Sequence, residues 1–394
     1  MIYLLVLVLL LILTIRYDIN GRTEYRDEWY NVVLVILILI AGLRFRLGED
    51  TISYIYMFYH NTPDVSDLDV DFLLDSDQPP LWILLTSIIK TIGGKFFVVQ
   101  LIEATFVNTL ILRYFKKHSP YPFACTAMYF FWRYQWYSMV VMKAAIALSL
   151  VLFANDFFLE KKYKKGILLI FIATGFHQSS ILLIIIPFLT FLRFNLLGVS
   201  LLIGAYIFSA FLQSMLGDVF QLLEFSDGMS NKLDNYLDSD YVTQVHNVNY
   251  FVARFFPLLF YPITSLLYIK QKCKDSTILK LEPFLMVGLI FQVMQFNIHI
   301  SYRYVYIYLF YFIIFMVHFF IEFAKKSLWL TKSIAYVRSF VFFLPFVAST
   351  AFFYSMMDVS FNPYSSVIER SIDKGRENYY KEIKYDYSLN KDEY

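Results

Sequence analysis

The feature that most constrains this chain is a set of long apolar runs without a charged side chain. Examples are Met1–Ile15, Asn31–Leu43, Gly166–Phe176 and Ser179–Leu192. In lipid, a helix satisfies its own backbone hydrogen bonds, and roughly 20 apolar residues cross the hydrocarbon core. Charged residues make up 17% of the 394 residues, whereas soluble domains average roughly 25%. The sequence therefore predicts an all-α, polytopic membrane protein.

About twelve apolar stretches follow one another along the chain, and we interpret them as spans. They lie near residues 1–15, 29–43, 96–115, 121–139, 144–159, 166–177, 179–193, 196–216, 251–269, 281–298, 303–322 and 335–355. A further segment, 79–94, starts at Pro79-Pro80 and stops at Gly93-Gly94, as a short helix does. Its apolar part is about 14 residues long and covers about two-thirds of the hydrocarbon thickness. We expect segment 79–94 to be re-entrant or interfacial.

The distribution of lysine and arginine predicts which loops face the cytoplasm. Basic residues gather at Lys116 and Lys117; Lys161, Lys162, Lys164 and Lys165; Lys270, Lys272 and Lys274; and Lys325, Lys326 and Lys332. Loops 44–78 and 217–250 are instead rich in aspartate and glutamate. The positive-inside tendency puts the basic loops inside and leaves the acidic loops outside. The spans then alternate correctly if segment 79–94 does not cross, and both chain ends lie outside.

Several simpler classes of protein are disfavoured. The net charge of +2 comes without a basic patch suited to nucleic acid, and Cys125 and Cys273 do not form a disulfide framework. The first apolar segment lacks a basic start and a small-residue cleavage site, so we expect a retained span. We interpret residues 1–355 as one membrane domain with external loops 44–78 and 217–250, and residues 356–394 as a polar tail.

The densest polar stretch of the chain, Arg44–Thr51, follows directly after the second predicted span. An arginine fork donates hydrogen bonds to phosphate in pairs, and a nearby carboxylate such as Asp50 can accept a proton. Under the predicted topology, four further ionisable residues reach the same external face: Lys143, His177, His299 and Arg303. Ionisable groups in spans are functional candidates by default. The ordinary alternative is that cations snorkel to headgroups and histidines bond helix-end carbonyls.

The order and spacing of three motifs resemble those of a known protein family. Arg44-x-x-x-Gly48-x-Asp50-x-x-x-Tyr54 follows the second span, and Lys143-Ala144-Ala145-Ile146-Ala147 and Phe176-His177-Gln178-Ser179-Ser180 follow later. Together they resemble the EpsG family of bacterial membrane proteins, the Wzy-like polymerases of exopolysaccharide, capsule and O-antigen. The second motif is similar to that family's Arg-Gln-x-x-Ala, and the third to its Phe-His-x-Ser-Ala. Arg303 and Asn362-Pro363-Tyr364 are weaker similarities.

This chain departs from the family pattern in two places. Lysine stands at 143 where the family has arginine, which keeps the charge and loses the bidentate fork, and alanine stands at 144 in place of glutamine. The acid that the family often shows before its third hydrophobic segment would fall near Gln78, with Asp77 beside it. The departures weaken the transfer of a role to Lys143 and leave Arg44, Asp50 and His177 untouched.

The resemblance implies an inverting glycosyltransferase of the GT-C type. Such an enzyme moves a glycan from polyprenyl (undecaprenyl) diphosphate to a sugar hydroxyl of the next lipid-linked repeat. The resemblance also implies an active site on the external, periplasmic face of the bacterial inner membrane. Partners would be the lipid-linked oligosaccharide, the bilayer, a chain-length regulator and a flippase. We expect no cofactor, no protein metal site and no nucleic acid, and leave open whether the reaction requires a metal ion.

The reaction asks for cations at the departing diphosphate and for a base at the attacking hydroxyl. We assign the diphosphate to Arg44, Arg46, Lys143 and Arg303, and the acceptor or glycan to Tyr54 and His299. Asp50 and His177 are the two candidate bases, and a histidine titrates near neutral pH. The resemblance implies an essential acid in an early external loop, so we favour Asp50 as the base. His177 would then orient the acceptor or the diphosphate.

Two other functions stay open at this point. A transporter, such as a flippase of lipid-linked sugars, often shows internal repeats and broken helices, and we find no convincing repeat here. An integral membrane acyltransferase with His177 as base would need an acyl-donor site, which no motif marks. The surface polysaccharide of a deletion strain distinguishes these classes. A ladder collapsed to one repeat indicates polymerisation, and total loss with precursor accumulation indicates transport.

The predicted topology can be tested by labelling. Asp67→Cys and Asp234→Cys place thiols in the two acidic loops, and both should react with an impermeant thiol reagent on intact cells. Reaction after permeabilisation is the control for accessibility. Protection of the Asp67→Cys thiol alone would show that the N-terminal part of the topology is inverted.

Overall fold

The computed structural model describes residues 2–76, 78–222, 256–273, 277–298, 301–325 and 359–382, and also residues 344 and 347. Over these ranges the backbone forms helices and no β-strand, with one isolated antiparallel bridge between Arg44 and Ser366. The all-α prediction is confirmed. The predicted span 335–355, apart from those two residues, and the greater part of loop 217–250 lie outside the described residues, as do Asp77 and His299.

Five helices of the described chain are long and apolar enough to cross a membrane: Ile2–Ile19, Phe96–His118, Met142–Leu159, Thr277–Met294 and Tyr302–Lys325. Shorter apolar helices are Pro80–Thr91, Gln178–Leu189 and Leu196–Leu212. The protein is therefore a membrane protein with several apolar helices. The count of twelve spans and the GT-C likeness stay predictions.

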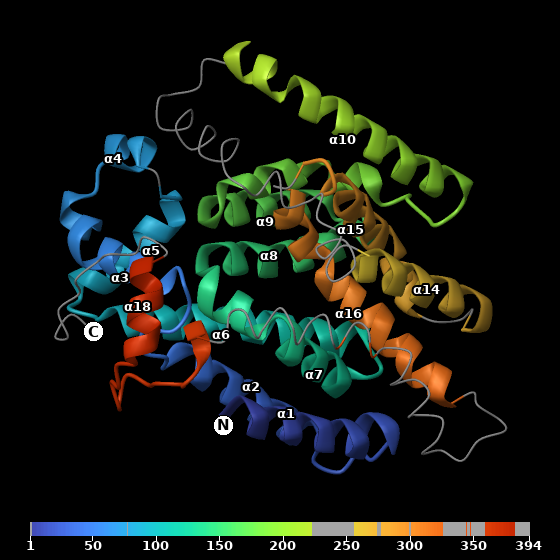
Figure 1. Cartoon of the computed structure of the whole chain (residues 1–394), viewed down its shortest axis with the longest axis horizontal. Coiled ribbons are helices and arrows are strands. Elements are labelled where there is room, and N and C mark those ends of the chain that lie inside the picture. Colours follow the sequence, from blue (N-terminus) through green and yellow to red (C-terminus); the bar gives the residue numbers. More distant parts are fainter. Residues whose placement is uncertain are drawn as a thin grey trace. The chain divides into compact units, whose positions relative to one another are not determined.

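The chain forms two compact units, Met1–Ile185 with Phe352–Tyr394, and Ile186–Ala351. The first contains α1 (Ile2–Leu13), η1 (Thr14–Ile19), α2 (Arg26–Gly42), α3 (Thr51–Tyr56), η2 (Met57–Asn61), η3 (Val65–Asp67), α4 (Val70–Asp75), α5 (Pro80–Thr91), α6 (Phe96–His118), α7 (Pro122–Trp132), η4 (Trp136–Val140), α8 (Met142–Leu159), α9 (Tyr163–Phe176) and α18 (Lys374–Glu382) (Figure 1). The second contains α10 (Leu196–Leu222), α14 (Phe256–Lys272), η7 (Thr277–Leu281), α15 (Glu282–Met294) and α16 (Tyr302–Lys325). η5 (Gln178–Leu189) spans the boundary.

Close helix packing builds the core of the first unit. α8 is apolar around its whole circumference and is buried along most of its length, as a central helix must be. It runs antiparallel to α9, where Gly166 lies against the ring of Phe158. Gly42 of α2 similarly lies against Leu101 of α6. Small residues at these crossings let the helix backbones approach closely, which is the usual way in which helices associate in lipid.

Two predicted spans have local structures that apolarity alone did not indicate. The stretch 121–139 is broken at Arg133, where α7 ends at Trp132 and η4 begins at Trp136. The buried Arg133 guanidinium lies 5.2 Å from the centre of the Trp132 ring. η5 is a 3₁₀-helix of 12 residues. Because a 3₁₀-helix rises about 2.0 Å per residue, this segment reaches about 24 Å rather than the about 18 Å of an α-helix.

α5 is a 12-residue helix whose two ends contact the same segment of chain. Near its start, the rings of Trp82 and Tyr54 lie 5.6 Å apart. Near its end, Lys90 Nζ donates to the carbonyl oxygens of Tyr59 and Thr62, at 3.2 and 2.6 Å. Both ends of α5 are thus held against residues 54–62. This arrangement is what a re-entrant or interfacial segment requires, although its depth in a bilayer stays a prediction.

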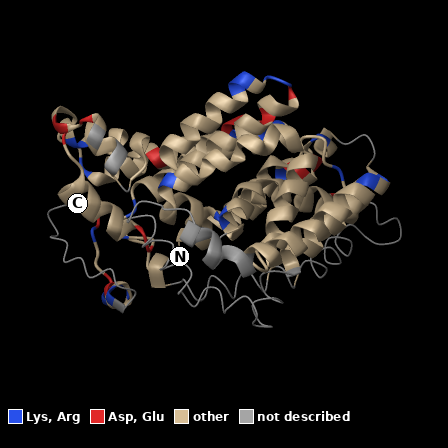
Figure 2. Cartoon of the chain, turned by 90° about the horizontal axis from the view of Figure 1, so that it is seen from above, with Lys and Arg blue, Asp and Glu red and all other residues tan. Residues whose placement is uncertain are grey.

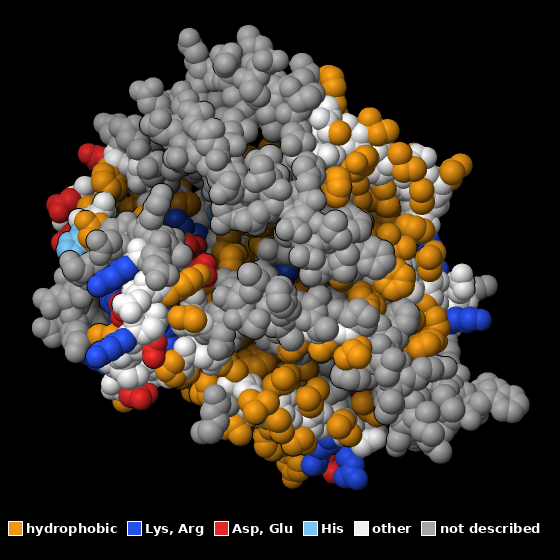
Figure 3. Space-filling view, in the orientation of Figure 1, with side chains coloured by type: hydrophobic (Ala, Val, Ile, Leu, Met, Phe, Trp, Pro, Cys, Tyr) orange, Lys and Arg blue, Asp and Glu red, His pale blue; other side chains and the backbone are white. Residues whose placement is uncertain are grey.

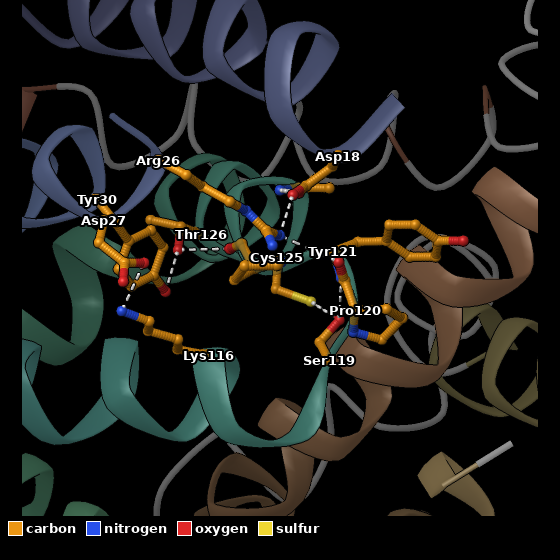
Figure 4. A network of polar contacts seen from close by, with 12 residues as sticks. Asp18, Arg26, Asp27, Tyr30, Lys116, Ser119, Pro120, Tyr121, Cys125 and Thr126 are labelled. Atoms are coloured by element: carbon orange, nitrogen blue, oxygen red, sulfur yellow. Dashed lines mark hydrogen bonds and ion pairs between the residues drawn. The ribbon is translucent and has the colours of Figure 1, made fainter. Parts of the chain in front are cut away.

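Polar side chains join the turns at the opposite end of the first unit (Figure 4). The Asp18 carboxylate, which has no exposed surface, accepts from Arg26 (3.2 Å) and from the backbone N–H of Ala124 (2.8 Å). Arg26 also donates to the carbonyl of Pro120 (3.3 Å), and Lys116 pairs with Asp27 (2.8 Å). These bonds fasten the turn between α1 and α2 to the turn between α6 and α7.

Charged and apolar surfaces are separated as a membrane requires. Figure 2 shows helices that are largely free of charge along their lengths, with Lys, Arg, Asp and Glu gathered mostly toward their ends and in loops. Large apolar side chains are exposed on the helices, among them Leu4, Leu5, Leu168 and Phe171, and Figure 3 shows wide hydrophobic areas on one face of the molecule. In water such surfaces would be sites of association. Here they are suited to lipid.

A buried acid and aromatic packing join the described helices of the second unit. Glu282, at the start of α15, accepts from Lys270 Nζ (2.8 Å) and from the backbone N–H of Phe194 (2.6 Å). Gly288 of α15 lies against Tyr308 of α16. α16 is buried along almost its whole length, although its sequence is rich in tyrosine and phenylalanine. Arg303 stands in its first turn, 6.0 Å from the ring of Tyr302.

Replacing Asp18 should destabilise the first unit. Asp18→Ala leaves the Ala124 N–H and the Arg26 guanidinium without their common acceptor, which costs about 1–3 kcal/mol. We expect a lower thermal denaturation temperature for the purified protein in detergent. Asp27→Ala is the matched control, because the Asp27 side chain is 70% exposed and exposed ion pairs contribute little. Equal shifts for the two variants would contradict this role of Asp18.

Candidate functional site

The loop between α2 and α3, residues 44–50, is named here the motif loop, and the buried side chain of Arg44 organises it. The Arg44 guanidinium donates to the carbonyl oxygens of Ala41 (2.5 Å), Leu47 (3.3 Å) and Met139 (3.2 Å). These carbonyls belong to the end of α2, to the loop and to η4. Arg44 therefore fastens the motif loop to two other segments, and the guanidinium has no exposed surface.

Gly48 is required by the shape of the same loop. Its φ is +96°, and a Cβ added there would lie 2.4 Å from the carbonyl oxygen of Met139. The hydroxyl of Thr51, at the start of α3, lies 2.7 Å from the Leu47 oxygen and 3.0 Å from the Met139 oxygen. The first motif therefore has a structural reason for its spacing. Arg44 and Gly48 bring one side of the loop against η4, and Asp50 follows as a half-buried residue at the start of α3.

Residues 359–382, named here the C-terminal arm, pack on the motif loop. Three backbone hydrogen bonds join the arm to the loop and its flanks, from Phe45 N to Ser365 O (2.9 Å), from Gly48 N to Ser360 O (3.2 Å) and from Val367 N to Leu43 O (2.8 Å). Figure 1 shows α18 of the arm beside α3 and α5. The sequence predicted a polar tail from residue 356 and assigned it no partner, whereas the structure folds this part of it onto the first motif.

Two charged side chains of the motif loop are bonded to α18. Arg46 Nε and a terminal nitrogen donate to the two carboxylate oxygens of Glu377, at 2.9 and 2.6 Å. Glu49 accepts from the hydroxyl of Tyr379 at 2.8 Å. Burial raises the pKa of Glu49, and the Tyr379 hydroxyl opposes that rise. In this structure, therefore, Arg44 and Arg46 are both engaged by protein groups, and the diphosphate contact predicted for each stays a prediction.

Lys143 meets the first motif directly. It stands in the first turn of α8, where Nζ donates to Gln78 Oε1 at 2.6 Å and lies 5.1 Å from the centre of the Tyr54 ring. An ammonium over the face of an aromatic ring is attracted by the ring quadrupole. The ring of Trp82 also packs against the Tyr54 ring, and the two ring centroids lie 5.6 Å apart. The result is a half-buried amine bonded to an amide and lying over one aromatic ring.

His177 lies at the same end of the first unit. It directly follows α9, its backbone N–H donates to Ala173 O (2.8 Å), and its carbonyl accepts from Ser180 N (2.9 Å). Gly175, two residues earlier, packs against Leu81 of α5. Because α8 and α9 are antiparallel, the end of α9 lies beside the start of α8, which carries Lys143. The three sequence motifs therefore lie at the same end of the first unit.

Two predicted site residues are not placed at this end. Arg303 belongs to the second unit, and His299 lies outside the described residues. Their participation in a common site stays a prediction. No cluster of three or more His, Cys, Asp or Glu side chains suited to a metal ion occurs within the ranges that the structure describes.

Sequence reasoning did not single out four residues that the structure places at this site: Trp82, Glu377, Tyr379 and Tyr380. Trp82 follows the Pro79-Pro80 pair, so its position at the start of a short helix was detectable. The other three lie in α18, which has no apolar stripe long enough to reveal a packed helix. Gln78 stands near the position where the family often has an acid, and in the structure its side-chain oxygen accepts a hydrogen bond from Lys143.

A family model described as the EpsG family matches residues 28–366. The chain belongs to the EpsG family. EpsG proteins are Wzy-like polysaccharide polymerases, so the resemblance drawn from the three motifs is confirmed. The match includes the motif loop, Lys143, His177 and the first part of the C-terminal arm, and α18 follows it. No curated protein and no solved structure matches this EpsG chain.

Arg44→Lys should sharply reduce polymer length. A lysine keeps the charge, but its single ammonium group cannot bond the Ala41, Leu47 and Met139 carbonyls with the geometry of the fork. The measurement is the ladder of surface polysaccharide in cells with matched amounts of protein. Arg22→Lys, at an exposed position in the turn between α1 and α2, is the matched control. A normal ladder from Arg44→Ala at a normal protein level would contradict a role for this residue.

Proposed function

We propose that this EpsG protein joins lipid-linked oligosaccharide repeats into a surface polysaccharide by glycosyl transfer. The donor is a glycan on polyprenyl (undecaprenyl) diphosphate, and the acceptor is a sugar hydroxyl of the next repeat. Membership of a polymerase family supports this role. The observation that carries the proposal is that Lys143 of the second motif lies over the ring of Tyr54 of the first, at the end of the first unit where α9 ends at His177.

The proposed step is a displacement at the anomeric carbon of the donor sugar. The bond from that carbon to the diphosphate oxygen breaks, and the bond from the acceptor oxygen forms on the opposite face, so the anomeric configuration inverts. The acceptor hydroxyl gives its proton to Asp50, and the diphosphate leaves as an anion. A positioned base and preorganised positive charge are the two usual contributions of a protein to such a step.

We propose distinct roles for the cations. Lys143 contacts the departing diphosphate, because its half-buried amine lies beside Tyr54, at the end of the first unit where the three motifs lie. Arg44 holds the motif loop through three carbonyls, and a phosphate would reach its guanidinium after some of these bonds break. Arg46 and Arg303 complete the set of cations that the sequence predicts for the diphosphate.

Aromatic and histidine side chains would hold the sugars. Lys143 lies over the Tyr54 ring, and Trp82 packs beside that ring. Both rings are buried in this structure, so a sugar would stack on Tyr54 once the side chains that cover the ring have moved. His177, half-buried at the end of α9, would orient the acceptor or the diphosphate, and His299 would join it. We place this site on the external face of the bacterial cytoplasmic membrane, where a flippase supplies the substrate and a chain-length regulator can act.

The division of roles between Asp50 and His177 is tested with purified protein and lipid-linked repeat units. Asp50→Asn should abolish transfer and leave donor binding largely intact, because the amide keeps the shape and cannot take a proton. His177→Ala should weaken transfer less. Asp67→Asn, in the same external loop and exposed, is the matched control. If Asp50→Asn still polymerises and His177→Ala does not, the two roles must be exchanged.

A further inference from the structure

We propose that the C-terminal arm is a positioning element of the transferase, which holds the motif loop in the shape that aims Asp50 at the acceptor. This inference rests on the proposed function and goes beyond it, because it assigns a role to residues that follow the matched region. Its positioning residues are Glu377, Tyr379 and Tyr380 of α18. They act through the motif loop.

The arm has an internal scaffold of its own. Arg376 is 1% exposed, and its guanidinium donates to the carbonyl oxygens of Val359 and Pro363. Its backbone N–H donates to Asp373 Oδ1 at 2.8 Å, which fixes the start of α18. One buried side chain thus joins α18 to the beginning of the arm. α18 is thereby fixed relative to the residues that bond the loop backbone, rather than attached through its surface alone.

The side chains of α18 contact the motif loop at successive points. Glu377 holds the Arg46 guanidinium with two bonds, the Tyr380 hydroxyl donates to the Arg46 carbonyl at 3.3 Å, and Tyr379 donates to Glu49. These contacts end one residue before Asp50. They therefore fix the segment from which the proposed base projects.

The backbone of the motif loop needs such support. Arg46 has a φ of +52°, in the left-handed region that non-glycine residues seldom occupy, and Gly48 follows at +96°. A non-glycine residue persists in such a conformation where its surroundings determine it. The motif loop lies between Arg44, which bonds it from inside, and the arm, which bonds it from the other side. Loosening the arm should let the loop relax and move Asp50.

The alternative role for Glu377 is that of a lid residue. A carboxylate bonded to an arginine fork resembles a bound phosphate, and α18 as a lid would compete with the diphosphate for Arg46. The burial of Arg376 and Tyr380, each 1% exposed, and the backbone bonds to Phe45 and Gly48 oppose this view. A lid would have to break all of them in each cycle. The geometry is that of a fixed support.

The test compares Glu377→Gln, Tyr379→Phe and Tyr380→Phe in the purified full-length protein with lipid-linked repeat units. Glu369→Gln, an exposed glutamate of the same arm, is the matched control. We expect kcat to fall about 10- to 100-fold in Glu377→Gln, as small misplacements of catalytic groups do, with a nearly unchanged KM. Glu377→Asp should recover part of the rate. Hydrogen exchange at residues 44–50 should speed up while the thermal denaturation temperature stays close to that of the parent protein.

Each result supports or overturns the positioning role of the C-terminal arm. A kcat for Glu377→Gln equal to that of Glu369→Gln, with unchanged exchange in the motif loop, overturns the inference and leaves the proposed function standing. A lower KM or a higher kcat overturns it in favour of a competing lid. If Glu377→Gln does not fold, the single-hydroxyl variants Tyr379→Phe and Tyr380→Phe give the same reading. A parent protein that makes no polymer from these substrates refutes the proposed function, and the inference with it.

Discussion

A guanidinium without contact to solvent must be bonded by the protein, and the arrangement at Arg44 follows from that constraint. Burial of an unpaired charge is among the most costly events in folding. The Arg44 fork is matched to carbonyls at the end of α2, in the motif loop and in η4. The direction in which the chain leaves α2 is thereby determined. The positions of Asp50 and of α3 follow from it, and so does the close contact that excludes any side chain at Gly48.

The helices around this centre show how a membrane chain uses segments shorter than a full span. Both ends of α5 contact residues 54–62, which precede it in the chain, through Trp82 near its start and Lys90 near its end. η5 gains length by its 3₁₀ geometry. η5 is irregular backbone next to the candidate site, which in lipid is tolerated where protein or water satisfies its polar groups. In the described part of the first unit, the motifs lie at the end that holds α5 and the start of η5.

The two ends of the first unit differ in how their charges are satisfied. At one end, Asp18, Arg26, Asp27 and Lys116 form pairs between neighbouring turns, which gives that end a network suited to stability. At the other end, Arg44 and Arg46 bind backbone carbonyls and an acid from far along the chain, and Lys143 is placed against an aromatic ring. The second pattern holds polar groups close together at a helix end. That is the arrangement a transferase with a lipid-linked diphosphate substrate would need.

The sequence by itself determined the membrane class, the order of the helices and the family. These properties are local, because apolar runs respond to lipid wherever the chain leads, and each motif is read within a few residues. The tertiary structure decided the partners of the motif residues. Lys143 meets Gln78 across 65 residues and Arg46 meets Glu377 across 331. No periodicity links residues so far apart, because such pairs depend on how the helices pack. In addition, α18 has no apolar stripe that would have revealed its packing on the motif loop. Arg44 shows the same division: its presence marked a candidate functional loop, and the packing of η4 gave it the Met139 carbonyl as a distant partner.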